Sequence, residues 1–552
     1  MSRTLASPGE PLPGAMNIGR RRALRIGADR AALTVLLLAA CMAVLTFRDY
    51  GVTWDEPGLR TYGQMLVAWY RSGFADGSAF SFANLRYYGG AFDIMATLLE
   101  PWTGLDPYAW RHLLGAVVGL AGLALTWRLG RRLGGPGAGL MALLLLATLP
   151  GWWGHMFFNS KDVPFAVGML ASLAIWVRCL EEWPEPRLRS ALLLGLAVGL
   201  TLGVRVGGIM LGLIVAPSLA LLLAADARRF GWSAAAHAAA GVVLRLLPAL
   251  PVALAVLLPA WPWVALAPGN FLEAVGYLSH FPYSADTIFA GQRYPAPAVP
   301  LGYWPTLLAL QLPEVVLAGL LLAAGIAMAR PWRPVLTTGD RRALGLVTVA
   351  AAALLPLAYA MLARPTSYNL LRHFIFVLPP LMILAGLGLD RALRLVPPGW
   401  RLASGGLVAI GLMLPLLRIA QLHPYAYVYF NDLSGGVAAA AGRYELDYWG
   451  TSFGELGRNL EASLSRHPDA LGLRPIPARI CGPFETSQAV LPPSLLPVHH
   501  DAPARLAVAI DIFFCVPPAP GDELARVERA GVVLSRAYRT RPDALITSFS
   551  SP

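Results

Sequence analysis

Long apolar runs alternate with short polar stretches and predict a chain that crosses a membrane many times. A helix needs about 20 apolar residues to cross roughly 30 Å of hydrocarbon. About eleven runs approach that length, of which the third and fifth are the shortest: 31–47, 109–128, 137–151, 163–180, 190–204, 207–224, 246–266, 304–328, 343–363, 373–389 and 402–420. We therefore expect an all-α polytopic membrane domain over 31–420, with a cytoplasmic tail at 1–30 and outward loops at 48–108 and 267–303.

The pattern changes after residue 420, where apolar runs become too short to span a bilayer. Phe453 to Leu464 has the spacing of an amphipathic helix, and Leu506 to Val516 fits a buried strand. Arg526 to Tyr538 fits a pair of strands. Residues 421–552 are therefore predicted to form a small extracytoplasmic α/β region.

Arginines gather in alternate loops and predict the orientation of the chain. Short basic loops stay on the cytoplasmic side of a membrane. The pattern predicts a cytoplasmic N-terminus and an outward C-terminus, in the inner membrane of a bacterium. The clusters assigned to the cytoplasmic side are Arg20, Arg21, Arg22, Arg25 and Arg30; Arg128, Arg131 and Arg132; Arg187 and Arg189; Arg228 and Arg229; Arg330, Arg333, Arg341 and Arg342; and Arg391, Arg394 and Arg401.

Composition supports this class of protein. The chain is 56% hydrophobic and only 14% charged, whereas soluble domains carry about 25% charged residues. The net charge of +12 comes with no nucleic-acid-binding motif, so no nucleic-acid partner is expected. The four cysteines form no CxxC pair. A disulfide between Cys481 and Cys515 is one option, which spacing alone does not decide.

Candidate chemistry begins with Asp55 and Glu56, directly after the first apolar run. Adjacent carboxylates above a membrane are costly unless they are solvated, paired or bound to a cation. They could provide a general base or ligands for a divalent cation. The alternative is a solvated loop turned by Pro57.

A second polar group lies in the turn between the third and fourth runs and holds His155, Asn159, Lys161 and Asp162. Lys161 is the only lysine in the chain. It could neutralise a phosphate or contact a lipid headgroup. Asp162 could face the first acidic pair, but its place just before Pro164 also suits a helix cap.

A third group opens an apolar run from the outside with Arg372 and His373, preceded by Tyr368. Cations at this position oppose both the positive-inside trend and the helix dipole, so an anionic partner is expected. A phosphodiester, Asp162, Glu56 or a headgroup would serve. Arg205 lies between two apolar runs and is either a buried ion-pair residue or part of the same site.

These segments, taken in order, resemble GT-C superfamily glycosyltransferases, and more narrowly the bacterial relatives of protein O-mannosyltransferases and aminoarabinose transferases. The resemblance implies a polyprenyl-phosphate-linked sugar as donor and transfer with inversion to an acceptor hydroxyl on the outer face of the membrane. The acceptor class, whether lipid, glycan or protein, stays open. The segments that carry the resemblance are Val52 to Pro57, Asn159 to Pro164, Arg372 to Phe374, His423 to Asn431 and Asp447 to Gly450.

Roles for individual residues follow from that resemblance. Asp55 is the expected base, and Glu56 and Asp162 are expected to orient the acceptor or, with Asp55, to hold a divalent cation. Lys161, Arg372 and His373 are expected to bind the donor phosphate. The residues expected to line the cavity are His155, Asn159, Arg205 and Tyr368.

A rival interpretation is a multi-pass transporter or lipid-carrier flippase. Transporters place their sites near the middle of the membrane, on interrupted helices. The charges here gather at the outer ends of the predicted spans, which favours catalysis. An anchored binding protein is a third reading, but one span suffices for an anchor.

Overall fold

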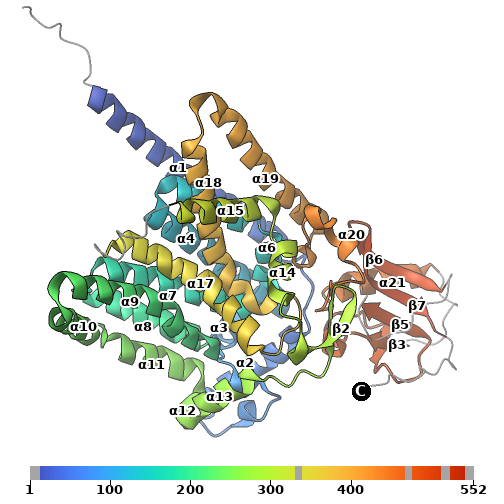
Figure 1. Cartoon of the computed structure of the whole chain (residues 1–552). Helices are drawn as coiled ribbons and strands as arrows, with labels where there is room; N and C mark the ends of the chain where they lie inside the picture. The colour runs from blue at the N-terminus through green and yellow to red at the C-terminus, as the bar shows by residue number, and fades with distance from the viewer. Residues whose placement is uncertain (1–12, 330–338, 467–474, 511–521, 541–552) are drawn as a thin grey trace, which may run out of the picture.

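The computed structural model describes residues 13–329, 339–466, 475–510 and 522–540. A bundle of helices makes up most of the molecule, and a smaller domain with a β-sheet lies at one end of it (Figure 1). The predicted fold class, a helical multi-pass membrane protein with a small C-terminal α/β domain, is confirmed. Arg330, Arg333 and Cys515, on which two of the predictions above depend, lie outside the described residues.

Seven straight segments in the described part of the chain are long and apolar enough to cross a membrane. The outermost, α1 and α19, are mostly exposed, as expected of helices that face lipid. The seven are α1 (Pro13–Thr46), α4 (Pro107–Gly134), α7 (Asp162–Glu181), η4 (Val206–Ile209) with α9 (Met210–Phe230), α17 (Arg341–Ala363), η6 (Arg372–Val377) with α18 (Leu378–Leu395), and η7 (Pro398–Trp400) with α19 (Arg401–Leu422).

Three further helix pairs are bent, and each break contains or directly precedes a proline: Pro150, Pro248 or Pro313. Proline lacks the backbone donor and disfavours a helical residue before it. Counting each pair as one span gives ten among the described residues, not the eleven expected. The pairs are α5 (Pro136–Ala147) with α6 (Pro150–Phe158) at 65°, α10 (Trp232–Leu246) with α11 (Ala249–Ala260) at 41°, and α14 (Tyr303–Gln311) with α15 (Glu314–Met328) at 118°.

Two predicted spans differ in detail from the structure. The fifth run forms α8 (Leu188–Leu202), which has only 15 residues and is too short to count as a full crossing. The run predicted at 246–266 is preceded by α10, so the helical segment begins at Trp232.

The two predicted outward loops contain short helices and a hairpin at the end of the bundle where the site lies. Their aromatic side chains, including Tyr62 and Phe271, pack in a small core together with Trp261 from the end of the predicted span 246–266. The elements are α2 (Asp55–Arg71), η1 (Ser78–Phe80), η2 (Leu85–Tyr87), α3 (Ala91–Leu99), η3 (Glu100–Trp102), α12 (Pro262–Leu266), α13 (Gly269–Ser279), η5 (Ala296–Ala298), and the antiparallel pair β1 (Asp286–Phe289) and β2 (Gln292–Pro295).

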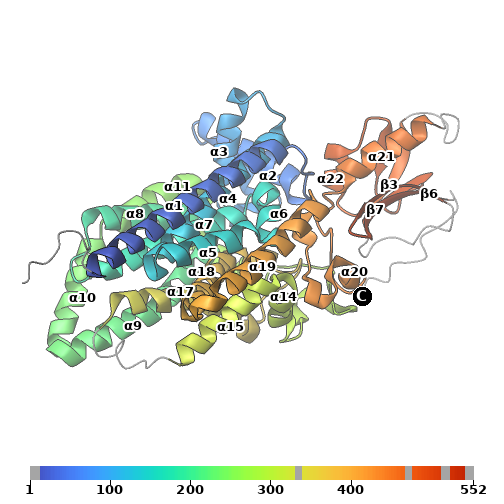
Figure 2. The ribbon, with the colours of Figure 1, turned by 90° about the horizontal axis from the view of Figure 1, so that it is seen from above.

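The C-terminal domain contains a five-stranded sheet in the order β4-β3-β5-β7-β6. β3 is parallel to both β4 and β5, whereas β7 is antiparallel to β5 and β6. The predicted helix and strands are present, and Figure 2 shows α21 beside the sheet. The elements are α20 (Gly436–Ala440), α21 (Phe453–Ser465), β3 (Ile476–Cys481), α22 (Phe484–Val490), β4 (Leu495–Val498), β5 (Leu506–Ile510), β6 (Glu523–Arg529) and β7 (Val532–Arg539).

The segment between α19 and α21 returns to the bundle and packs on it. It contains η8 (Ala426–Val428) and η9 (Asp432–Ser434). The Trp54 amide donates to the Trp449 carbonyl at 3.2 Å. Gly51 lies so close to the Thr451 carbonyl that an added Cβ would be 1.9 Å from its oxygen, so only glycine fits there. This junction brings residues 444–449 beside the starts of α2 and η6.

Candidate active site

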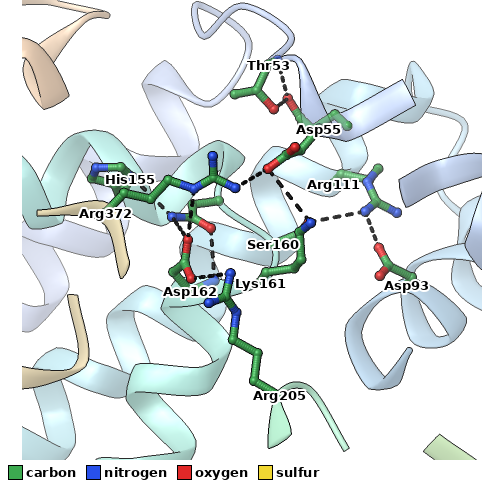
Figure 3. A network of polar contacts seen from close by, with 12 residues as sticks. Thr53, Asp55, Asp93, Arg111, His155, Ser160, Lys161, Asp162, Arg205 and Arg372 are labelled. Carbon is green, nitrogen blue, oxygen red and sulfur yellow. Dashed lines mark hydrogen bonds and ion pairs between the residues drawn. The ribbon is translucent and has the colours of Figure 1, made fainter. Parts of the chain in front are cut away.

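Five charged side chains from four separate places in the sequence meet at the end of the bundle (Figure 3). Asp55 begins α2, Lys161 and Asp162 lie at the start of α7, and Arg372 begins η6. Arg205 lies between α8 and η4, at a break in the helical backbone. Each group lies at the start of a helix or directly before it. The four helices concerned begin at the same end of the bundle, so the charged groups meet there. We call these five residues the charged cluster.

Arg372 joins the two acids of the cluster. Its Nη2 donates to Oδ2 of Asp55, and its Nε lies 3.4 Å from Oδ2 of Asp162. The guanidinium lies over the indole of Trp449, 4.6 Å from the ring centroid. Arg372 is buried. A buried arginine of this kind needs compensating charge, which the two carboxylates provide.

Lys161 and Arg205 complete the cluster from the opposite side. Lys161 Nζ lies 3.8 Å from Oδ2 of Asp55, and Arg205 Nη2 lies 2.7 Å from Oδ1 of Asp162. Both cations face the ring of Tyr88, at 4.7 Å and 5.7 Å from its centroid. An aromatic face attracts cations, so Tyr88 supports both.

Tyr88 reaches this position because Gly89 follows it. A Cβ added to Gly89 would lie 2.0 Å from the backbone oxygen of Gly203, at the end of α8. The Gly89 amide also donates to the Val204 carbonyl at 3.2 Å. The close backbone approach holds the loop of Tyr88 against the loop of Arg205.

Two carboxylates face three cations, so the cluster has one surplus positive charge and favours an anion. Burial acts to raise the pKa of Asp55, but the charges of Arg372 and Lys161 outweigh it and leave that pKa below its ordinary value. Burial lowers the pKa of Lys161. The Asp55 side chain is 29% exposed and the Asp162 side chain 3%. Asp55 is therefore the acid that a substrate can reach.

Asn159 and His155 hold Asp162 in place. Asn159 accepts the Asp162 amide at 2.9 Å and donates to Oδ2 of Asp162 at 3.0 Å. Asn159, not Asp162, thus caps the start of α7, which leaves the Asp162 carboxylate for the arginines. His155 Nδ1 lies 3.2 Å from the Asn159 amide nitrogen, and its Nε2 lies 3.3 Å from the Tyr448 hydroxyl.

Tyr368 and His373 pack edge-to-face beside the cluster. Their ring centroids are 4.6 Å apart at an interplanar angle of 79°. Tyr368 stacks in parallel on Tyr283, with centroids 3.8 Å apart. The structure therefore brings these two predicted residues close to Arg372, within a wall of rings and not as ion-pair partners of the acids.

Glu56 does not join the charged cluster. Its Oε2 accepts the amide and the hydroxyl of Thr53 at 2.8 and 3.1 Å, and its Oε1 lies 3.0 Å from His112 Nε2. The side chain is 1% exposed. Sequence alone could not separate the two adjacent acids, but successive residues of a helix point in different directions, and Glu56 points into the protein.

The cation site expected from Asp55, Glu56 and Asp162 is not formed. Within the described residues no group of three such side chains is arranged to hold a metal ion. Glu56 is turned toward His112, and three cationic side chains already surround the other two acids. A divalent cation would be repelled by those charges, so these residues do not fit one.

Sequence reasoning missed a second buried ion pair, between Asp93 and Arg111. Arg111 also lies 3.4 Å from the Ser160 hydroxyl, next to Lys161. Burial raises the pKa of Asp93, and Arg111 opposes that effect. The available signal was an acid inside the apolar stretch 91–99 and a cation at the start of the next span.

A narrow cavity of about 30 Å³ adjoins Arg372. Polar groups line one part of it, including His155, Tyr427 and Tyr448, and leucines line another. The remaining lining residues are Leu149, Gly151, Gln311, Leu312, Leu370, Leu371, Ile375, Leu378 and Tyr429. A cavity of this size has room for about one water molecule, so it shows only that polar and apolar side chains meet beside Arg372.

Part of the chain matches the sequence model of a known protein family. Residues 110–258 match the family model of dolichyl-phosphate-mannose-protein mannosyltransferases. No sequence among the curated proteins matches the chain.

Two solved structures are similar in outline. ArnT from Cupriavidus metallidurans bound to undecaprenyl phosphate is 17% identical, with 93% of this chain and 97% of that chain covered, at a TM-score of 0.46. The oligosaccharyltransferase AglB from Archaeoglobus fulgidus, in complex with an inhibitory peptide and a dolichol-phosphate, is 13% identical, with 87% and 69% covered, at 0.46. The family match over residues 110–258 confirms the expected relationship of this chain to the GT-C glycosyltransferases.

Proposed function

We propose that this protein is an inverting glycosyltransferase that moves a sugar from a polyprenyl-phosphate carrier to an acceptor hydroxyl. The observation that carries the proposal is the charged cluster, in which the accessible carboxylate of Asp55 pairs with Lys161 and Arg372 while Arg205 pairs with the neighbouring Asp162. General-base catalysis needs the carboxylate, and departure of a phosphate needs the cations. The family match over residues 110–258 supports the same class of donor.

In this proposal Asp55 accepts the proton of the acceptor hydroxyl as its oxygen attacks the anomeric carbon. The bond between that carbon and the phosphate oxygen breaks, and the carrier phosphate leaves with the bonding electrons. Negative charge grows on the phosphate during this step. Cations that are already in place stabilise it more in the transition state than in the ground state, which lowers the barrier.

Arg372 is shared between the two acids before substrate binds. A donor phosphate would compete with Asp55 for its guanidinium, because both are anions on the same face. Release from Arg372 would raise the pKa of Asp55 toward its ordinary value and make it a better base. Donor binding would therefore activate the base.

The family match, to a model of dolichyl-phosphate-mannose-protein mannosyltransferases, supports a lipid-linked donor over a free sugar nucleotide. Leu149 and Leu312 lie near Arg372, so apolar side chains adjoin the cation proposed to bind the phosphate. We place the reaction on the outer face of a bacterial inner membrane, with a cytoplasmic N-terminus, because the basic clusters favour that orientation.

A transporter or lipid-carrier flippase is the alternative function. The α14–α15 pair, bent by 118°, is the feature that favours it, since transporters use broken helices at their sites. The charged cluster lies at helix starts instead, which favours catalysis.

The test is incubation of the purified full-length protein, in lipid nanodiscs, with radiolabelled polyprenyl-phosphate sugars and a bacterial membrane extract as the source of acceptor. Appearance of label in a new product that depends on Asp55 supports transfer. Movement of intact carrier across vesicle membranes, with no sugar released, would instead establish the flippase.

A further inference from the structure

The two residues before Leu371 and Arg372 form an unusual turn. Asn369 and Leu370 both have positive φ, at 57° and 58°. Non-glycine residues seldom adopt this region, and bulky residues do so least of all. Such a conformation persists only where its surroundings enforce it. Something must therefore hold the turn that leads into Arg372.

Glu445 is the group that holds it. Its Oε2 accepts the Asn369 amide at 2.9 Å, and the Asn369 carbonyl accepts the Arg372 amide at 3.3 Å. Two hydrogen bonds thus connect the Glu445 carboxylate to the backbone of Arg372. Glu445 is 2% exposed, so water does not replace it as the acceptor.

The residues on the N-terminal side of Glu445 are fixed in turn by the β1–β2 hairpin. The Gly291 amide donates to the Arg443 carbonyl at 2.9 Å. The ring of Phe289 packs edge-on against Tyr444, with centroids 5.9 Å apart. Glu445 is therefore presented by a firmly packed segment, as a group that positions another residue must be.

We propose that Glu445 is a positioning residue, whose carboxylate holds the left-handed turn at Asn369 and Leu370 and so aims Arg372 at Asp55 and Asp162. It contacts none of the reacting groups itself. The consequence for catalysis rests on the proposed function, because it assumes that Arg372 binds the donor phosphate. The hold on the turn can be measured without any substrate.

The first experiment is hydrogen–deuterium exchange on the full-length protein in nanodiscs. Glu445→Ala should speed exchange of the Asn369 amide at least tenfold. Glu445→Gln should leave it near wild type, since a side-chain carbonyl still accepts the bond. Glu455→Ala is the matched control, because Glu455 also accepts hydrogen bonds in this region but from Tyr425 and Arg529. Unchanged exchange in folded Glu445→Ala would overturn the proposal.

A second experiment separates holding the turn from general stabilisation. Leu370→Gly removes the penalty for positive φ, so the turn needs less support. The effect of Glu445→Ala on donor kcat/KM, expected to be about a tenfold loss, should then shrink to threefold or less in a Leu370→Gly background. Equal losses in both backgrounds would mean that Glu445 does not act through the turn.

The two hypotheses fail in different ways. If wild-type protein transfers no sugar but the exchange result holds, the proposed function fails, whereas the finding that Glu445 holds the turn at Asn369 and Leu370 remains. The other outcome is that wild type transfers sugar and Glu445→Ala speeds exchange of the Asn369 amide without changing donor KM or kcat. In that case Glu445 holds the turn, but the proposal that it positions Arg372 for catalysis is wrong.

Discussion

The guanidinium of Arg372 lies over the indole of Trp449, 4.6 Å from the ring centroid, although 76 intervening residues and α18 and α19 separate them in the chain. The indole covers one face of the guanidinium and leaves its edge free to donate to Asp55 and Asp162. Planar stacking of this kind is a property of arginine that lysine does not share. The geometry of Arg372 therefore depends on the segment that follows α19.

Loss of the proposed base should abolish most activity. Asp55→Asn keeps the shape and removes the proton acceptor, so transfer should fall about 10²–10⁴-fold. The measurement is label transfer from a polyprenyl-phosphate sugar by protein in nanodiscs. Asp49→Asn is the matched control, because Asp49 is an exposed acid nearby that pairs with His423. Wild-type turnover by Asp55→Asn would remove Asp55 from the role of base.

Replacement of Arg372 by lysine should not preserve function. Lysine keeps the charge but cannot bridge two carboxylates and stack on Trp449 at once. We expect donor KM to rise about tenfold or more, since each lost charge-assisted bond is worth roughly 1.5–3 kcal/mol. In Arg372→Ala, which removes the charge, the pKa of Asp55 should rise, so the acid limb of the kcat/KM profile should move to higher pH. A profile unchanged from wild type would contradict the pairing.

Tyr88 should act through its ring and not through its hydroxyl. Tyr88→Phe keeps the face beneath Lys161 and Arg205 and should retain near wild-type activity. Tyr88→Leu removes it, at roughly 0.5–2 kcal/mol per cation, which corresponds to a loss of about two- to thirtyfold for each. Steady-state donor kinetics on both variants would check this. Equal losses in the two variants would point to the hydroxyl.

Glu56 and His112 should behave as one unit. Both are buried and face each other at 3.0 Å, so removal of either leaves the other without its partner. Glu56→Ala and His112→Ala should each lower the thermal midpoint, and the double variant should be little worse than either alone. Thermal unfolding monitored by tryptophan fluorescence would measure this coupling. Additive effects would show that the pair is not coupled.

Stability should fall with rising pH through Glu445. Burial raises the pKa of Glu445 from 4.5 to about 7. The folded state therefore holds this proton more tightly than the unfolded chain, and the stabilisation present below about pH 4.5 is lost as pH rises through about 7. The titratable groups that face Glu445 are the phenols of Tyr283, Tyr303 and Tyr448, which ordinarily ionise only near pH 10.

The Tm in detergent should accordingly fall as pH rises from 4.5 to about 7 and should level off above that range, and Glu445→Gln should flatten the fall. Glu455→Gln should leave the slope as in wild type. A wild-type slope in Glu445→Gln would assign the effect to another group.

The sequence predicted the parts of the fold that depend on one segment at a time. Apolar runs located most spans, since crossing hydrocarbon constrains length and composition locally. It located the short run that forms α8, but it did not foresee the bend of 118° at Leu312 and Pro313. A proline in an apolar run indicates a break, but its angle depends on packing.

The charged residues of the site could be predicted because they lie at or within apolar spans. Asp55, Lys161, Asp162, Arg205 and Arg372 were all singled out because ions at or within apolar spans need partners, and the structure gives them one another. Trp449, Tyr88 and Glu445 support those groups across long sequence separations. Trp449 lies in a segment that carries the family resemblance, but no local pattern indicates which charged group an aromatic or an acid in a polar loop will support.

The return of residues 444–449 to the bundle sets where this protein can be recombined with a relative. In a chimaera joined at the end of α19, Arg372 would come from one parent. Trp449 and Glu445, which contact Arg372 and the turn before it, would come from the other. A breakpoint after Ser452 would transfer α21 and the sheet as a block while leaving Glu445 and Trp449 with the helices they serve. We therefore expect the C-terminal domain to be exchangeable from that point onward.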